Sequence, residues 1–165
     1  MEIKTIKIGD VEIKQTAALA PMASVADRAY RLVCKEHGAA YMVSEMISAK
    51  GLCYSDRKTE ELCTVDDRER PYALQIFGEE PDFCARAAAM LMKYKPDILD
   101  INMGCPKQFS IQGNMGASLL KTPDVAYNVS DMVDCSRRLS KPFRPPFRSP
   151  FPARSVCSMA PWRIQ

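Results

Sequence analysis

The chain has 165 residues, of which 47% are hydrophobic and 26% charged, a balance typical of one soluble domain with its own core. No apolar stretch approaches the ~18 residues of a membrane span, and Met1–Thr5 does not open a secretion signal, so we expect a cytoplasmic protein with no membrane partner. Seven cysteines, an odd number without a Cys-x-x-Cys pair, argue against a disulfide framework and predict reduced thiols and no metal site.

The distribution of charge divides the chain into two parts. Residues 1–134 carry all 20 acidic residues and 16 of the 23 basic ones, whereas residues 135–165 carry seven basic residues and no acid. Six of the 12 prolines follow residue 141, and proline both removes backbone donors and disfavours helix before it. We therefore expect residues 1–140 to form the folded unit and residues 141–165 to form a disordered, Pro/Arg-rich tail.

Strands and helices are predicted to alternate along the folded unit. The strands are continuous apolar runs, which indicates a parallel sheet covered by helices, and hence an α/β fold. Two architectures fit, a doubly wound sheet and a (β/α)8 barrel of the TIM type; a complete barrel needs ~250 residues, so the chain would hold only about its first four units. The predicted strands are 11–14, 17–20, 39–43, 72–77 and 97–101, and the predicted helices are 27–37, 48–53, 59–62, 80–94 and 123–133.

Unusual residues follow the ends of the four predicted parallel strands. Small residues and amide side chains at such an edge predict a seat for a flat heterocycle with polar edges. A thiol placed where a strand ends is a candidate for chemistry. The residues concerned are Pro21, Met22 and Ala23 after the first strand, Ser44, Glu45 and Met46 after the second, Gln75 near the end of the third, and Asn102, Gly104 and Cys105 after the fourth.

These residues also have purely structural interpretations. Gln75 could satisfy a neighbouring backbone group, and Glu45 could be an ordinary polar cap at a strand end. His37, the only histidine, is predicted at a helix end, where it favours the helix dipole. A cysteine–histidine nucleophile pair would have to use His37, away from the strand ends, so the sequence does not favour cysteine-protease chemistry.

One ordered set of motifs resembles a known family. The segment Asp100–Pro106, followed by Gly113 and by Gly116–Leu120, resembles the signature of the tRNA-dihydrouridine synthases, most closely the bacterial ones. The segments Ala20–Ala23 and Leu74–Gly78 fall where that family has flavin-contacting motifs. The resemblance covers about residues 8–134.

The resemblance implies an FMN-dependent (β/α)8 barrel followed by a helical domain that helps to bind tRNA. It implies that NADPH reduces the flavin, that hydride passes to C6 of a uracil in tRNA, and that Cys105 gives a proton to C5. It places Pro21, Met22, Ala23 and Gln75 against FMN, and Asn102 against the uracil or the flavin edge. An ordinary thiol, with a pKa of ~8.5, is mostly protonated at neutral pH and can act as such an acid.

The sequence after residue 141 does not continue this pattern. The resemblance implies later strands with a lysine, a histidine and a phosphate site, and residues 143–165 do not match them. We interpret this change as a shift in reading frame or a degraded gene, and expect this truncated form to be inactive. Reading the other two frames beyond the codon of Pro142 tests the interpretation.

Two other functions remain open from the sequence. One is an FMN-dependent dehydrogenase of free pyrimidines, since such enzymes also place Cys-Pro after a strand. The other is a non-catalytic fragment whose basic tail binds RNA through its phosphates, with the strong salt dependence that such contacts give. The sequence does not predict the oligomeric state or the tRNA position modified.

Overall fold

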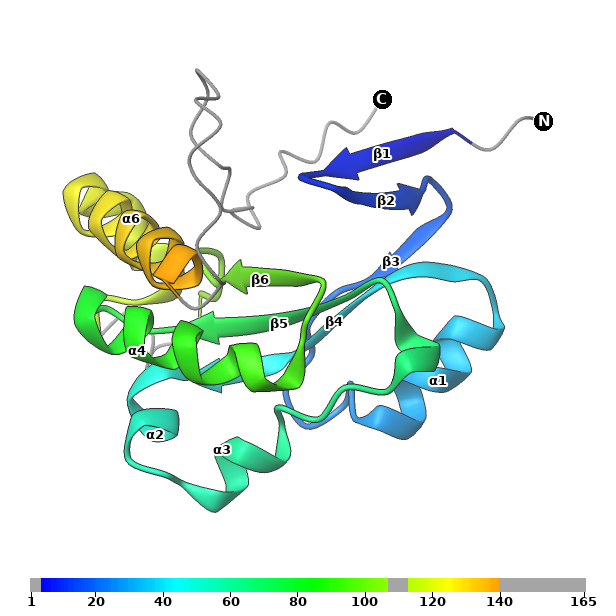
Figure 1. Cartoon of the computed structure of the whole chain (residues 1–165), viewed down its shortest axis with the longest axis horizontal. Coiled ribbons are helices and arrows are strands. Elements are labelled where there is room, and N and C mark those ends of the chain that lie inside the picture. The colour runs from blue at the N-terminus through cyan, green and yellow to red at the C-terminus, as the bar shows by residue number, and fades with distance from the viewer. Residues whose placement is uncertain (1–3, 107–112, 140–165) are drawn as a thin grey trace.

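The computed structural model describes residues 4–106 and 113–139, and within them the side chains up to residue 134 (Figure 1). A short antiparallel hairpin precedes an alternation of parallel strands and helices. The strands are β1 Thr5–Ile8, β2 Val11–Lys14, β3 Ala17–Leu19, β4 Ala39–Ser48, β5 Tyr72–Phe77 and β6 Ile98–Ile101. The helices are α1 Arg28–Glu36, α2 Ala49–Cys53, α3 Arg57–Glu61, α4 Pro81–Leu91 and α6 Pro123–Leu139, with 3₁₀ helices η1 Asp67–Glu69, η2 Met92–Tyr94 and η3 Gly116–Lys121.

The main sheet has four parallel strands in the order β3-β4-β5-β6, which confirms the predicted α/β class with a parallel sheet. Each strand lies beside the next in the sequence, as in a barrel and unlike the reversed order of a doubly wound sheet. In the register between β5 and β6, Gln75 lies opposite Asp100. This pairing brings together two polar residues of the candidate site.

Helices α4 and α6 pack against each other and cover one face of the sheet (Figure 1). Leu74 and Ile76 of β5 and Ile101 of β6 enter the main core with Leu91 of α4 and Val129 of α6, and all five are at most 1% exposed. Side chains alternate between the faces of a strand, so Gln75 and Asp100 must lie on the opposite face.

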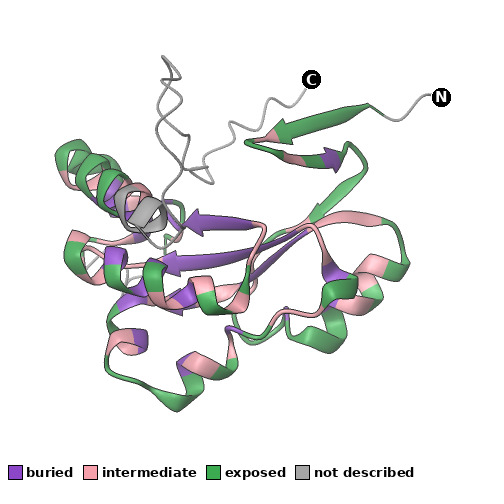
Figure 2. Ribbon diagram, viewed as in Figure 1, coloured by how far each residue is buried: buried purple, intermediate pink, exposed green. Residues whose placement is uncertain are grey.

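The opposite face has an apolar end and a polar end. Near the starts of β5 and β6, Ala73 and Ile98 form a second core cluster with Val43 and with Ile13 of the hairpin. Figure 2 shows the central strands as buried, whereas much of the hairpin is exposed. The hairpin thus covers the beginning of this face, and the polar residues occupy its C-terminal end.

The structure differs from the prediction at two strands, β4 and β1. The strand predicted to end at Val43 continues to Ser48 through an irregularity in the register between Val43 and Met46, so Ser44–Met46 lies within β4 rather than after it. The strand β1 was not predicted; it pairs with β2 and covers the apolar end of the sheet. A strand that pairs locally and is largely exposed shows little hydrophobic pattern.

The predicted tail, residues 141–165, lies outside the described residues. Within the described part, the structure has no helix long and apolar enough to cross a membrane.

Candidate active site

Three buried polar side chains meet at the C-terminal edge of the sheet. Gln75 is 0% exposed, Asp100 4% and Asn102 6%. Polar groups at this level of burial need hydrogen-bond partners, because an unpaired one costs roughly 1–3 kcal/mol. The partners of these side chains therefore determine how the site is organised.

Gln75 lies between Asp100 and Asn102. Its Nε2 donates to Asp100 Oδ2 over 2.6 Å, and its Oε1 accepts from Asn102 Nδ2 over 2.9 Å. The same Asn102 nitrogen also approaches Met46 Sδ at 3.0 Å, while the backbone N–H of Gln75 donates to Ser44 Oγ over 2.9 Å. The two amide residues predicted from the strand ends are thus in direct contact.

Asn102 also holds the loop that carries Cys105. Its Oδ1 accepts the backbone N–H of Gly104 over 3.2 Å and that of Cys105 over 3.0 Å. Asparagine commonly fixes turns in this way. Cys105 itself is partly exposed and its thiol is free. The predicted position of this thiol, just beyond the end of β6, agrees with the structure.

The second sequence motif packs on the first. Ala117 N donates to Cys105 O over 3.0 Å. Gly116 has a φ of +59°, and a Cβ added there would lie 2.6 Å from Cys105 O and 3.1 Å from Cys105 Cβ. Only glycine fits this position without displacing the backbone of Cys105. The two motifs therefore form one unit around the cysteine.

The loop with Pro21, Met22 and Ala23 follows β3 at the same edge of the sheet. Ala23 is exposed, and Pro21 and Met22 are half-buried. Met22 O accepts the N–H of Ala26 over 2.9 Å, which folds the loop into a turn. The neighbouring Ser24 N donates to the Glu45 carboxylate. Glu45 is therefore a support for this loop rather than a cap at a strand end.

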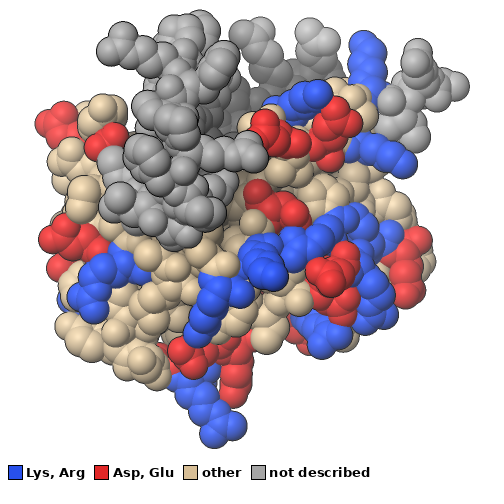
Figure 3. All heavy atoms as spheres, viewed as in Figure 1, with Lys and Arg blue, Asp and Glu red and all other residues tan. Residues whose placement is uncertain are grey.

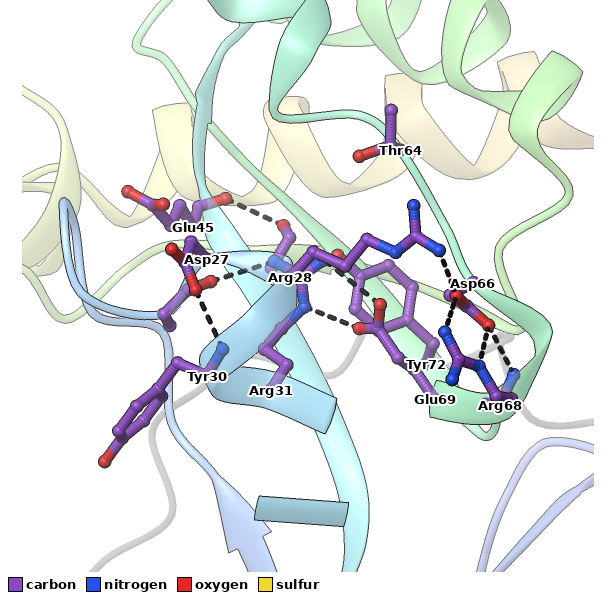
Figure 4. A network of polar contacts seen from close by, with 12 residues as sticks. Asp27, Arg28, Tyr30, Arg31, Glu45, Thr64, Asp66, Arg68, Glu69 and Tyr72 are labelled. Carbon is purple, nitrogen blue, oxygen red and sulfur yellow. Dashed lines mark hydrogen bonds and ion pairs between the residues drawn. The ribbon is translucent and has the colours of Figure 1, made fainter. Parts of the chain in front are cut away.

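A buried ion pair between Arg31 and Glu69 contacts the end of the same loop at Ala26. The side chains of Arg31 and Glu69 are 5% and 0% exposed, with Arg31 Nε 2.5 Å from Glu69 Oε2 (Figure 4). Arg31 Nη1 donates to Ala26 O over 2.8 Å, and its guanidinium lies 5.1 Å from the centre of the Tyr72 ring. This cluster joins α1, the loop before β5 and the loop after β3.

The sequence predictions did not assign a role to Asp100. Burial raises the pKa of its carboxyl to about 6, although hydrogen bonds from Gln75 and from the backbone of Ile101 act in the opposite direction. The signal was present in the sequence, since an acidic residue interrupts the apolar run Ile98–Ile101. The pair of Arg31 and Glu69 had no comparable signal, because 38 residues separate its members in a charged part of the chain.

The hydrogen bonds bring together some of the predicted residues and leave others separate. Gln75, Asn102 and Cys105 form one connected group, whereas the loop Pro21–Ala23 is held by contacts to β4 and α1. Two hollows, of about 120 and 710 Å³, lie further along the same strand-end edge. The smaller is lined in part by Phe77 and Met115, and the larger opens between α4 and α6.

The described residues contain no group of three or more His, Cys, Asp or Glu side chains that could hold a metal ion. Gln75, Asn102, Asp100 and Cys105 supply two amides, one carboxyl and one thiol at the sheet edge. Amide groups suit the carbonyl and N–H edge of a flat heterocycle.

Comparison with known proteins identifies the class. The model of the family described as dihydrouridine synthase matches residues 18–148, and the chain belongs to this family. The match runs past residue 134, where the resemblance in motifs ended. The architecture is the predicted TIM-barrel type, of which the described residues hold four parallel strands.

Individual relatives agree with this assignment. The chain is 34% identical over 128 residues to tRNA-dihydrouridine synthase B of Vibrio cholerae, covering 78% of this chain and 40% of that protein. It is 34% identical over 125 residues to a probable tRNA-dihydrouridine synthase of Rickettsia prowazekii, covering 75% and 38%. The chain thus spans about 40% of the length of the curated relatives it matches.

Proposed function

We propose that this chain carries part of the active site of an FMN-dependent tRNA-dihydrouridine synthase, which reduces the C5=C6 bond of a uridine in tRNA with electrons from NADPH. Membership of the family supports the reaction class. The single observation that supports the site is the connected group in which Asn102 holds the backbone of Cys105 at the end of β6. We further propose that residues 1–140 are the N-terminal half of the barrel.

Cys105 is the proposed proton donor. A bound FMN, once reduced by NADPH, would supply the hydride that adds at C6 of the uracil. The negative charge that this addition leaves at C5 and O4 requires an acid, and we assign that role to the Cys105 thiol, which is partly exposed just beyond the end of β6. A positioned general acid contributes roughly 10²–10⁴ in rate.

Asn102 is the proposed contact to the uracil. Both hydrogens of its amide are engaged, one with Gln75 Oε1 and the other with Met46 Sδ. A thioether sulfur is a weak acceptor. A uracil carbonyl could therefore replace Met46 at this hydrogen at little cost, while the bond to Gln75 and the hold on Cys105 remain.

The proposed FMN contacts are Pro21, Met22, Ala23 and Gln75. The exposed, small Ala23 leaves room for a flat ring beside the loop, and contacts from Glu45 and Arg31 fix that loop. Gln75 uses one amide hydrogen and one lone pair internally, so one donor and one acceptor remain on its amide. These groups suit the polar edge of an isoalloxazine ring, but Gln75 is 0% exposed, so contact with FMN requires the residues that cover it to move aside.

The proposal is tested first on the chain itself. FMN binding is followed by quenching of flavin fluorescence, and dihydrouridine is measured by mass spectrometry after incubation with FMN, NADPH and unmodified tRNA. Free uracil is the parallel substrate. Reduction of uracil without reduction of tRNA would contradict the proposal and favour a dehydrogenase of free pyrimidines.

A chimera separates the function of the site from the length of the chain. In it, residues 1–139 replace the matching part of the Vibrio cholerae relative, and FMN binding verifies that the chimera is assembled. The proposal predicts dihydrouridine in tRNA. A chimera that binds FMN and forms no dihydrouridine contradicts it.

The third possibility, a non-catalytic RNA-binding fragment, rested on the tail, which lies outside the described residues. On the face in Figure 3, the described Lys and Arg side chains are interspersed with Asp and Glu rather than gathered in one basic patch. This face does not favour binding through phosphates alone.

A further inference from the structure

Asp100 is a buried carboxyl for which the proposed reaction has no direct use. It lies in β6, opposite Gln75 of β5, on the face of the sheet away from the helices. Its carboxyl accepts from Gln75 Nε2 and from the backbone N–H of Ile101. Keeping a carboxyl in such a position costs stability, as its raised pKa shows. A role for the group would explain why the strand contains it.

The contacts of Asp100 determine the orientation of two amides in succession. An ionised carboxylate only accepts hydrogen bonds. Gln75 must therefore turn its NH2 group toward Asp100, which leaves Oε1 facing Asn102. Asn102 must in turn present its NH2 group to Gln75, which leaves Oδ1 facing the backbone N–H groups of Gly104 and Cys105.

The opposite orientation of the Gln75 amide would disrupt the loop that carries Cys105. If Gln75 were flipped, its NH2 group would face Asn102, and Asn102 would have to present Oδ1 to it. The NH2 group of Asn102 would then point at the N–H groups of Gly104 and Cys105, placing donors against donors. The loop that carries the thiol would lose both of its side-chain hydrogen bonds.

We propose that Asp100 is a positioning residue: through the amides of Gln75 and Asn102, its acceptor-only carboxylate fixes the backbone of Cys105. The chain of contacts is continuous, with donor–acceptor distances of 2.6, 2.9 and 3.0 Å from Asp100 to Cys105 N. The importance of these contacts for catalysis depends on the proposed function of Cys105. The contacts themselves are independent of that proposal.

Amide hydrogen exchange in the full 165-residue chain tests this proposal without any assay of activity. In Asp100→Leu, which has a similar size and no acceptor, the N–H groups of Gly104 and Cys105 should exchange roughly tenfold faster or more. The N–H of Asn102, which donates to Ile76 O over 2.8 Å in the sheet, is the internal reference and should keep its protection. Unchanged protection at both Gly104 and Cys105 would overturn the proposal.

A second variant decides the case in which Asp100→Leu weakens the whole sheet. In Gln75→Glu/Asp100→Asn the carboxylate moves to position 75, where it accepts from the amides of both residue 100 and Asn102. The orientation of Asn102 is then the same as in the parent chain. This double variant should restore the protection of Gly104 and Cys105, and failure to restore it would overturn the proposal.

Asp97→Asn is the matched control. Asp97 lies directly before β6, and its carboxylate also accepts a backbone hydrogen bond, from Tyr72 N over 2.8 Å. It does not take part in the hydrogen bonds that link Asp100, Gln75 and Asn102. Its replacement should leave the exchange of Gly104 and Cys105 within about twofold of the parent. If Gly104 and Cys105 exchange as fast in Asp97→Asn as in Asp100→Leu, the effect is a general loss of stability. That result would contradict a specific role for Asp100.

Discussion

Gly116 lies against the backbone of Cys105, so close that a Cβ at Gly116 would come within 2.6 Å of the Cys105 carbonyl oxygen. The contact joins two motifs that the sequence separates, and Ala117 N adds a hydrogen bond to the same oxygen. Cys105 is therefore held from two sides, by Asn102 and by the Gly116 turn. A small change on either side should alter the position of the thiol.

Replacement of Gly116 by alanine should destabilise the chain by about 2–4 kcal/mol. The substitution places a Cβ against backbone atoms that cannot move freely, at a φ of +59° that L residues rarely adopt. Chemical denaturation followed by circular dichroism measures the free energy of unfolding.

Gly104→Ala is the control for this substitution. Gly104 is next to Cys105, but a Cβ there meets nothing within 4 Å. We expect a loss of less than about 0.5 kcal/mol. Equal losses in the two variants would show that the clash with Cys105 does not determine the effect.

Replacement of Asp100 by asparagine should change how stability depends on pH. The pKa of Asp100 is raised to about 6 in the folded chain, above ~3.9 in the unfolded chain. The stability that its neutral form provides is fully present below pH ~4 and is lost as the pH rises through about 6. The free energy of unfolding of the variant, minus that of the parent, should therefore increase by on the order of 2–3 kcal/mol between pH 4 and 7.

Asp56→Asn is the comparison for the pH series. Hydrogen bonds from the side chain and backbone of Thr59 lower the pKa of Asp56, so its titration lies at acidic pH. The difference between this variant and the parent should change far less between pH 4 and 7 than that for Asp100→Asn, because only the titration of the unfolded chain near pH ~3.9 reaches into this range. An equally small change for Asp100→Asn would contradict the raised pKa.

Loss of Glu69 should be among the most damaging single changes. Glu69→Ala leaves the buried guanidinium of Arg31 without its counter-ion, which costs about 3–5 kcal/mol. The exposed pair of Arg57 and Glu61, at 3.3 Å, is the reference, and Glu61→Ala should cost less than ~1 kcal/mol. Thermal unfolding of both variants checks the difference, and similar losses would mean that the buried pair is not important for stability.

A bulky residue at position 23 should reduce FMN binding without unfolding the chain. Ala23 is exposed, so Ala23→Leu fills the space beside the loop rather than the core, and we expect at least a tenfold weaker Kd for FMN. Ala89→Leu, at an exposed position of α4, controls for an added surface leucine and should leave the Kd unchanged. Equal affinity of all three proteins would remove Ala23 from the proposed FMN site.

The sequence predicted the parts of the fold that are local in origin. The strand at 72–77 agrees with β5 because it is an apolar run between Pro71 and Gly78. The helix predicted at 80–94 continues only to Leu91 as α-helix and ends in a 3₁₀ turn at Met92–Tyr94. The prediction was least accurate at β4. The sequence indicates that this strand ends before Ser44, but an irregularity in the pairing with β5 allows it to continue through Ser44–Met46.

The candidate site was predictable residue by residue, but its connections were not. Gln75, Asn102 and Cys105 stand out because polar or reactive residues follow apolar strands. Two contacts, that of Asp100 with Gln75 and that of Arg31 with Glu69, join elements that lie 25 and 38 residues apart in the sequence. The register between β5 and β6 determines the first of these contacts, and sequence patterns do not specify it.

The most direct test of the account is the dihydrouridine content of tRNA treated with the chimera and with its Cys105→Ala variant. Cys53→Ala, which removes a half-buried thiol whose partner is Phe83 O, serves as the control. We predict that Cys105→Ala lowers the rate roughly 10²–10⁴-fold while FMN stays bound and Cys53→Ala remains active. An undiminished rate in Cys105→Ala would contradict the central claim that this thiol protonates the base.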